Sequence, residues 1–138
     1  MLISRHYIET HKKIAAQVEA ITKLISGGSI EDNAFDIGRE ISRLSGLLNV
    51  HLNSEDRYLY PKLLESNDSS VKTLAKRYQD EMGGLIGEFN EFKSRYNTKT
   101  RILENKAGLA REWNGIVKKL SHRIEREENE LYTKFERM

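Results

Sequence analysis

The sequence predicts an all-α protein with the architecture of an up-down-up-down antiparallel four-helix bundle. Apolar residues recur in alternating steps of three and four, the repeat of an amphipathic helix, and the β-branched runs typical of strands are absent. Turn-forming segments divide the chain into four long stretches, and their short connections imply antiparallel neighbours. We expect helices over residues 3–26, 31–65, 69–97 and 101–137.

Length and composition limit the classes of function. The chain has 138 residues, which suits one domain over residues 1–138. Charged residues make up 32% and are interleaved to a net charge of +2, so we expect no nucleic-acid partner. Cysteine is absent, so any metal ion must be held by nitrogen and oxygen donors. No segment approaches about 18 consecutive apolar residues, and we therefore expect a cytoplasmic protein without membrane association.

The first expected helix carries an apolar stripe with one polar residue in phase. The in-phase positions are Ile3, Tyr7, His11, Ile14, Val18, Ile21 and Ile25. His11 therefore faces the predicted core, whereas His6 lies at its edge. Ser26-Gly27-Gly28-Ser29 follows and ends the helix.

The second expected helix brings a histidine and a glutamate into the core. Its in-phase positions are Ile37, Ile41, Leu44, Leu48, His51, Glu55 and Leu59. Residues four apart on a helix lie on one face, about 40° apart around the axis. Buried polar groups are costly without partners, and a metal ion is the partner that uses a neutral imidazole and a carboxylate together. Pro61 is expected to kink or interrupt the helix near its end.

The third and fourth expected helices are mostly apolar on their inner faces. The third places Val71, Ala75, Tyr78, Met82, Leu85, Phe89, Phe92 and Tyr96 in phase. The fourth places Trp113, Ile116, Leu120, Ile124, Glu127 and Leu131 in phase. Glu127 therefore occupies a position that the pattern reserves for an apolar side chain. The rest of the charged run from Glu125 to Glu130 is expected to face solvent.

The four in-phase polar residues are expected at one end of the bundle. With a rise of about 1.5 Å per residue, His11 lies near the start of an ascending helix, and His51 and Glu55 lie toward the end of the descending one. Glu127 is late in the fourth helix, which ends at the same level. One such residue alone is more often an ordinary core or edge side chain. Four at one level, two of them spaced as His-x-x-x-Glu, favour a present or ancestral metal site.

This combination of residues resembles the hemerythrin-like (HHE cation-binding) domains over nearly the whole chain. The most specific element is His51 and Glu55 followed by Leu59-Tyr60-Pro61, and His11 and Glu127 match further elements. The resemblance implies a non-haem iron site. It implies that one iron takes a histidine from each of the first two helices and two bridging carboxylates, which correspond to His11, His51, Glu55 and Glu127.

The ligands of a second iron, which the resemblance places on the third and fourth helices, are largely replaced. The third helix has no histidine; Tyr78 and Met82 stand where ligands are expected, and Glu81 beside them is a substitute candidate. His122 lies about 160–200° from the apolar stripe of the fourth helix. It would reach the site only through a π-bulge or kink, and is otherwise a surface histidine. We hypothesise a degenerate site that holds one metal ion, with the second weak or absent.

Two functions from different classes follow. The first is a metal-binding sensor or storage module that holds one or two non-haem iron ions, or Mn or Zn, and meets oxygen, nitric oxide or peroxide. The alternative is a metal-free bundle that acts as a regulatory or protein-interaction module, in which Tyr78 and Met82 pack over a lost metal site. An enzymatic role has little support, because no further acid–base pair or substrate cleft is visible. A protein partner or a homodimer is compatible with either function.

Overall fold

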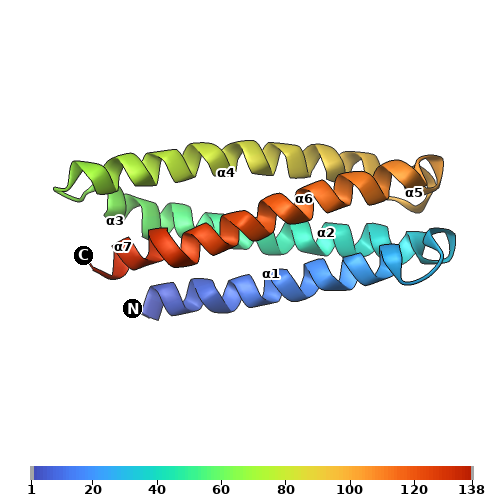
Figure 1. Cartoon of the computed structure of the whole chain (residues 1–138), viewed down its shortest axis with the longest axis horizontal. Helices are drawn as coiled ribbons and strands as arrows, with labels where there is room; N and C mark the ends of the chain where they lie inside the picture. The colour runs from blue at the N-terminus through green and yellow to red at the C-terminus, as the bar shows by residue number, and fades with distance from the viewer. Residues whose placement is uncertain (1, 138) are drawn as a thin grey trace.

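The computed structural model describes the backbone of residues 2–137 and the side chains from Arg5 onward, and it is an antiparallel bundle of long helices (Figure 1). Ile3, which was expected in the first apolar stripe, lies outside the described side chains. The all-α class is confirmed, and no strand occurs in residues 2–137. None of the described helices is long and apolar enough to cross a membrane.

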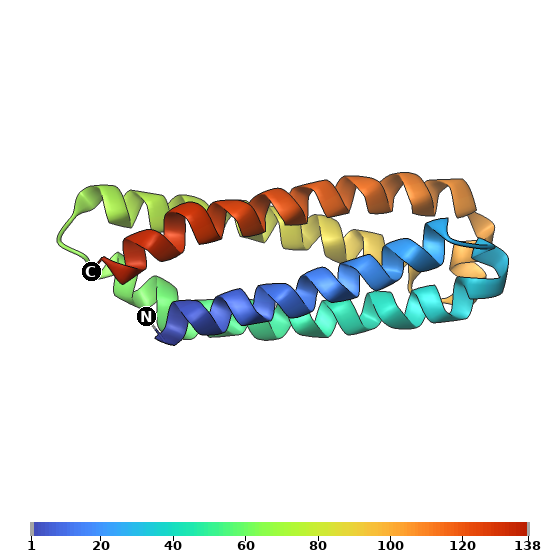
Figure 2. The same ribbon diagram turned by 60° about the horizontal axis from the view of Figure 1, so that its bottom comes forward.

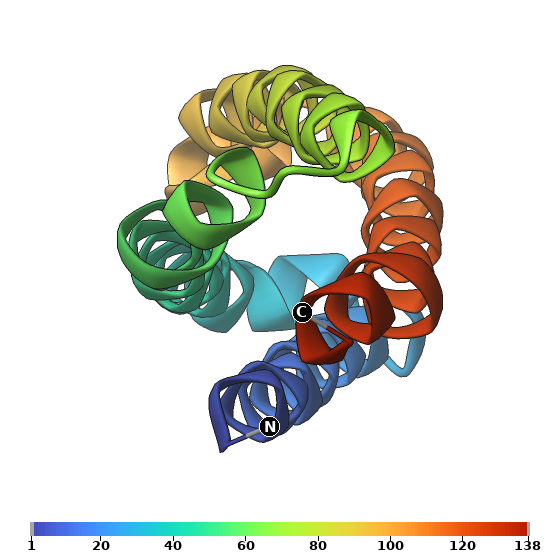
Figure 3. The same ribbon diagram turned by 90° about the vertical axis from the view of Figure 1, so that its left-hand side faces the viewer.

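Four long helices supply the frame of the bundle. They are α1 (Leu2–Ser26), α2 (Ile30–Ser54), α4 (Ser69–Tyr96) and α6 (Lys106–Arg126). Seen along the bundle they form a ring in the order α1, α2, α4, α6, and each packs against its two neighbours (Figure 3). The start of α1 and the last helix of the chain lie at the same end as α3 (Figures 1 and 2).

Capping residues begin most of the helices where the sequence predicts them. Ser29 accepts from the N–H of Asp32 at the start of α2, and Asp68 accepts from the N–H of Ser70 at the start of α4. Thr98 accepts from the N–H of Arg101 in the same way. Each side chain satisfies a backbone donor that the first helical turn leaves free.

The fourth predicted helix, residues 101–137, is not one continuous α-helix. It begins as the short α5 (Lys99–Glu104) and is interrupted at Asn105, whose backbone leaves the helical region with φ −152° and ψ 67°. The Asn105 side chain accepts from the N–H of Gly108 and so caps α6. The periodicity of the apolar residues continues across this break, which is why the break does not show in the pattern.

Two π-helical turns widen the helices at the end where the chain termini lie. The first, η1 (Glu55–Leu59), joins α2 to α3 (Tyr60–Leu64), and the second, η2 (Glu127–Leu131), joins α6 to α7 (Tyr132–Glu136). In each the N–H at the end of the turn donates to the carbonyl five residues earlier, from Tyr60 to Glu55 and from Tyr132 to Glu127. The interruption expected at Pro61 is therefore a π turn just before it. The wide turn brings each glutamate and the tyrosine five residues later toward the same face.

The apolar core consists of two clusters separated along the bundle. The larger one fills the middle and contains Trp113, Phe89 and Phe92. The smaller one closes the end and contains the four tyrosines Tyr7, Tyr60, Tyr78 and Tyr132. Along α1, His11 lies between Tyr7 of the end cluster and Ile14 of the central cluster. A buried polar layer is thus enclosed on both sides by apolar packing.

Candidate metal centre

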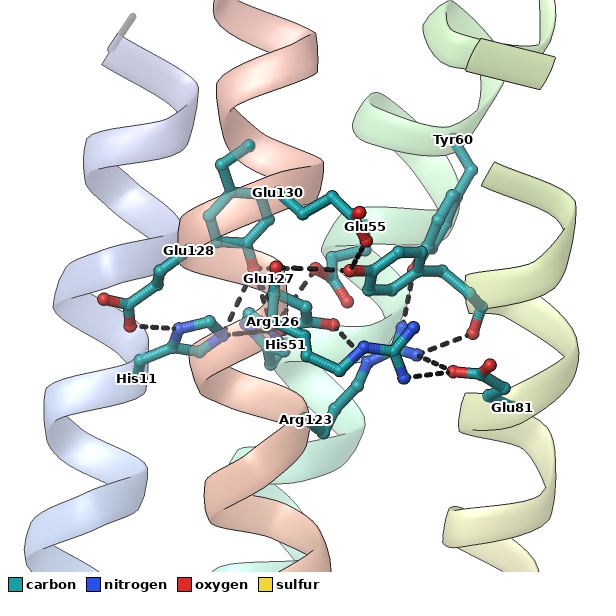
Figure 4. Close-up of polar contacts among 12 residues, drawn as sticks. His11, His51, Glu55, Tyr60, Glu81, Arg123, Arg126, Glu127, Glu128 and Glu130 are labelled. Carbon is teal, nitrogen blue, oxygen red and sulfur yellow. Dashed lines mark hydrogen bonds and ion pairs between the residues drawn. The ribbon is translucent and has the colours of Figure 1, made fainter. Parts of the chain in front are cut away.

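The buried polar layer brings together His11, His51, Glu55 and Glu127, all at most 3% exposed (Figure 4). The Nε2 atoms of His11 and His51 are 3.1 Å apart. Oε1 of Glu127 lies 3.0 Å from Nε2 of His11 and 3.7 Å from Nε2 of His51. Glu55 approaches from the other side, with Oε2 3.4 Å from Nε2 of His51. The donors come from α1, α2, η1 and η2, as helical phase predicts.

The orientation of His11 is set by a residue outside this group. Its Nδ1 lies 2.8 Å from Oε2 of Glu128. A carboxylate can only accept a hydrogen bond, so Nδ1 donates to it and Nε2 faces the cluster. Metal-binding histidines are commonly held by this kind of outer carboxylate. The half-exposed Glu128 lies in the charged run that was expected to face solvent, and the sequence analysis did not identify it.

Tyr132 places its hydroxyl among the four candidate metal ligands. The hydroxyl oxygen lies 2.8 Å from Oε2 of Glu55 and 3.2 Å from both Oε1 of Glu127 and Nε2 of His11. It is also 3.5 Å from Nε2 of His51. Burial, reinforced by the two carboxylates, raises the pKa of Tyr132 far above its usual range, so the hydroxyl keeps its proton and donates it to Glu55.

Arg123 forms the other side of the polar layer and is 5% exposed. Its Nε donates to Oε2 of Glu127 at 2.8 Å, so the two oxygens of this carboxylate face opposite ways, one toward the histidines and one toward the guanidinium. The two terminal nitrogens donate to the carbonyl of Tyr78 and to the hydroxyl of Tyr60, each at 2.9 Å. Every nitrogen of the buried guanidinium therefore has an acceptor.

Opposing charges set the protonation states of the layer. Burial lowers the pKa of His51, but the hydrogen bonds and charges of Glu127 and Glu55 outweigh it and raise the pKa to about 9. Burial would raise the pKa of Glu127, but the two histidines and Arg123 hold it well below its usual range. Without a metal ion, the cluster thus holds an ionised Glu127 and a proton on His51 at neutral pH.

Two buried polar atoms in the described chain have no hydrogen-bond partner, and both belong to this cluster. They are Oε1 of Glu55 and Nδ1 of His51. An unpaired carboxylate oxygen in a buried place is costly and favours a nearby cation.

The donor spacing suits a shared metal ion. Ligand atoms of His11, His51 and Glu127 all lie within 4.8 Å of one another. Donors held about 2.1 Å from one ion stand about 3.0–3.4 Å apart, close to the spacings between these atoms. Glu55 lies outside this group of three and adjoins it through His51, with one carboxylate oxygen that has no hydrogen-bond partner.

The residues considered for a second metal ion do not gather into a comparable group. His122 is exposed and lines a surface hollow with Glu81 and Arg126. The Glu81 carboxylate pairs with Arg126 at 2.7 Å. The Tyr78 hydroxyl donates to Glu130 at 2.6 Å, and Met82 packs in the central apolar cluster. The π-bulge that could have turned His122 inward does occur, but it begins only at Glu127, after His122 has been passed.

The fold and the site together define an antiparallel four-helix bundle with a buried imidazole–carboxylate layer that could hold a metal ion. The family model described as the hemerythrin HHE cation binding domain matches residues 2–135, nearly the whole chain. The chain therefore belongs to this family. No curated protein and no solved structure gives a significant match.

Proposed function

We propose that this chain binds a non-haem iron ion through His11, His51, Glu55 and Glu127 and uses it to bind or sense oxygen or nitric oxide. The observation that carries the proposal is the pair of imidazole Nε2 atoms 3.1 Å apart, buried and facing carboxylates. Two nitrogen lone pairs at this distance repel unless a proton or a metal ion lies between them. Two nitrogen and two oxygen donors suit Fe(II), and Mn(II) and Zn(II) accept the same donor set.

The surrounding residues are suited to hold such an ion in a dry place. A bound iron ion would supply a redox-active centre to which a diatomic ligand or a peroxide can attach. Glu128 fixes the imidazole of His11, and the apolar clusters on both sides limit the access of water. Glu55 and Glu127 neutralise the charge of the ion.

Metal analysis of the purified chain tests the first part of the proposal. The protein would be expressed under iron-replete conditions, purified without oxygen and assayed for metal by mass spectrometry. We expect bound iron in the native chain and none in His51→Ala. His122→Ala is the matched control, because this exposed histidine lies outside the cluster and its loss should leave the iron content unchanged. Native protein without metal under these conditions would sink the proposal.

Ligand binding tests the second part. Nitric oxide added to the anaerobic Fe(II) protein should change its visible absorption and produce a paramagnetic signal, and oxygen should change the absorption reversibly or by oxidation. The metal-free protein is the control for ligand binding elsewhere. Spectra that stay unchanged with both gases would restrict the function to metal binding or storage.

One observation supports the alternative, a metal-free bundle that serves as a regulatory or interaction module. The Tyr132 hydroxyl lies within 3.5 Å of donor atoms of all four residues, so most of the layer is hydrogen-bonded without any ion. In that case chelation should leave thermal stability unchanged. His51→Ala should then only destabilise the fold, by about 1–3 kcal/mol for an unsatisfied buried partner.

A further inference from the structure

Two segments of the chain, residues 51–60 and 123–132, share one local design. Both have an acidic residue at the fifth position and Leu-Tyr at the end, and both contain a π turn that begins at that acidic residue. The first segment begins with His51 and the second begins with Arg123. In each, the first residue reaches the carboxylate four positions on, at 3.4 Å for His51 and 2.8 Å for Arg123. Arg123, rather than His122, is therefore the counterpart of His51.

The tyrosines of the two segments cross over. Tyr132 donates to Glu55 of the first segment, and Tyr60 accepts from Arg123 of the second. The layer thus has two halves built alike, joined by the carboxylate of Glu127, which has one oxygen on each side. Histidine nitrogens face one half and a guanidinium fills the other (Figure 4).

The guanidinium is firmly held in its half. It has three acceptors from three elements, and its central carbon lies 4.5 Å from the centroid of the Tyr78 ring. A buried charge with this many partners is expensive to remove, because each partner would lose its bond without access to water. A metal ion on Oε2 of Glu127 would have to displace this guanidinium or lie against its positive charge.

We propose that Arg123 is a built-in cation that fills the second half of the layer, limits it to one metal ion and raises the reduction potential of that ion. This inference rests on the proposed function. The effect on the potential follows from charge alone: a fixed positive charge across Glu127 destabilises Fe(III) more than Fe(II). Arg123 acts on the metal ion through the carboxylate that they share.

Two variants separate the charge of Arg123 from its shape, and a third serves as the control. Arg123→Gln removes the charge, and Arg123→Lys keeps it with fewer donors. Arg126→Gln is the matched control, because Arg126 lies over the same Tyr78 ring, 4.8 Å from its centroid, but pairs with Glu81 instead of Glu127. Each protein would be titrated with Fe(II) without oxygen to count bound ions, and its midpoint potential would be measured by spectroelectrochemical titration.

We expect one iron per chain in the native protein and a lower potential in Arg123→Gln, with Arg123→Lys and Arg126→Gln close to native. If Arg123→Gln does not fold, Arg123→His supplies the comparison, since it restores the imidazole found at this place in residues 51–60. It should lower the potential and take up more than one metal ion per chain. Two irons in the native protein, or a potential that is unchanged when the charge of Arg123 is removed, would overturn the inference. Native protein that binds no iron would instead refute the proposed function on which it rests.

Discussion

The hydroxyl of Tyr132 offers a way to measure whether the polar layer is built around a cation. Tyr132→Phe removes the donor to Oε2 of Glu55, a 2.8 Å hydrogen bond inside the protein, and leaves that carboxylate only the 3.4 Å contact between Oε2 and Nε2 of His51. A hydrogen bond to a charged group contributes about 1.5–3 kcal/mol. We expect a loss of this size in the free energy of unfolding of the metal-free protein, and a smaller loss with metal bound, because an ion then partners Glu55.

Urea unfolding followed by circular dichroism measures both losses, with and without saturating metal. Tyr7→Phe is the control: its ring stacks on Tyr132 with centroids 5.4 Å apart, but its hydroxyl donates to the neutral carbonyl of Ser54. Removing the Tyr7 hydroxyl should lower the free energy of unfolding by about 0.5–1.5 kcal/mol, and this change should not depend on metal. Equal losses for Tyr132→Phe with and without metal would refute the idea that an ion takes over the partnership with Glu55.

Three further outcomes follow from contacts around the layer. Glu128→Gln should weaken metal binding about 10–100-fold in a metal-competition titration, because the imidazole that it orients loses a charged acceptor. The pKa of His51 is raised to about 9 from the ordinary 6.5, so the stability of the metal-free fold and the affinity for metal should change with pH in opposite directions between these values. The metal-free fold should lose stability as pH rises through this window, because the stabilising proton leaves. Over the same window metal affinity should increase about tenfold per pH unit, because the ion displaces that proton. Thermal melts and metal titrations across this range check both trends. Gly108→Ala should disturb the Asn105 cap, since a Cβ there would clash with the side-chain amide of that residue, and should cost about 0.5–2 kcal/mol in urea unfolding. Gly115→Ala meets nothing within 4 Å and should be neutral or stabilising.

The fold and the positions of the candidate ligands could be predicted because they depend on helical periodicity alone. His11 and His51 occupy core positions of the apolar repeat without shifting its phase. The antiparallel order of the helices places them at the same level of the bundle. Glu55 and Glu127 lie at the starts of the π turns, before the phase of either helix changes. Periodicity does not predict the π turns, but these turns leave the inward direction of the two glutamate side chains unchanged.

The partners of these residues were harder to predict because charged side chains are usually placed in solvent. Arg123 directly precedes the in-phase Ile124, and Glu128 directly follows Glu127 within a charged run. Burial of Arg123 depends on acceptors supplied by α3 and α4, which no local pattern contains. One signal was present: Arg123 stands four residues before Glu127, as His51 stands four before Glu55.

If the chain binds a metal ion as proposed, the charges of the layer make the metal-free and metal-bound bundles two states of one site. Glu127 is held ionised between the guanidinium of Arg123 on one side and the proton that His51 holds at neutral pH on the other. These opposing charges account for a hydrogen-bonded network that is nearly complete without an ion. A divalent ion that displaced the proton would add one positive charge to the layer. Were Arg123 absent, the layer would carry one positive charge less, and a bound ion would meet less repulsion.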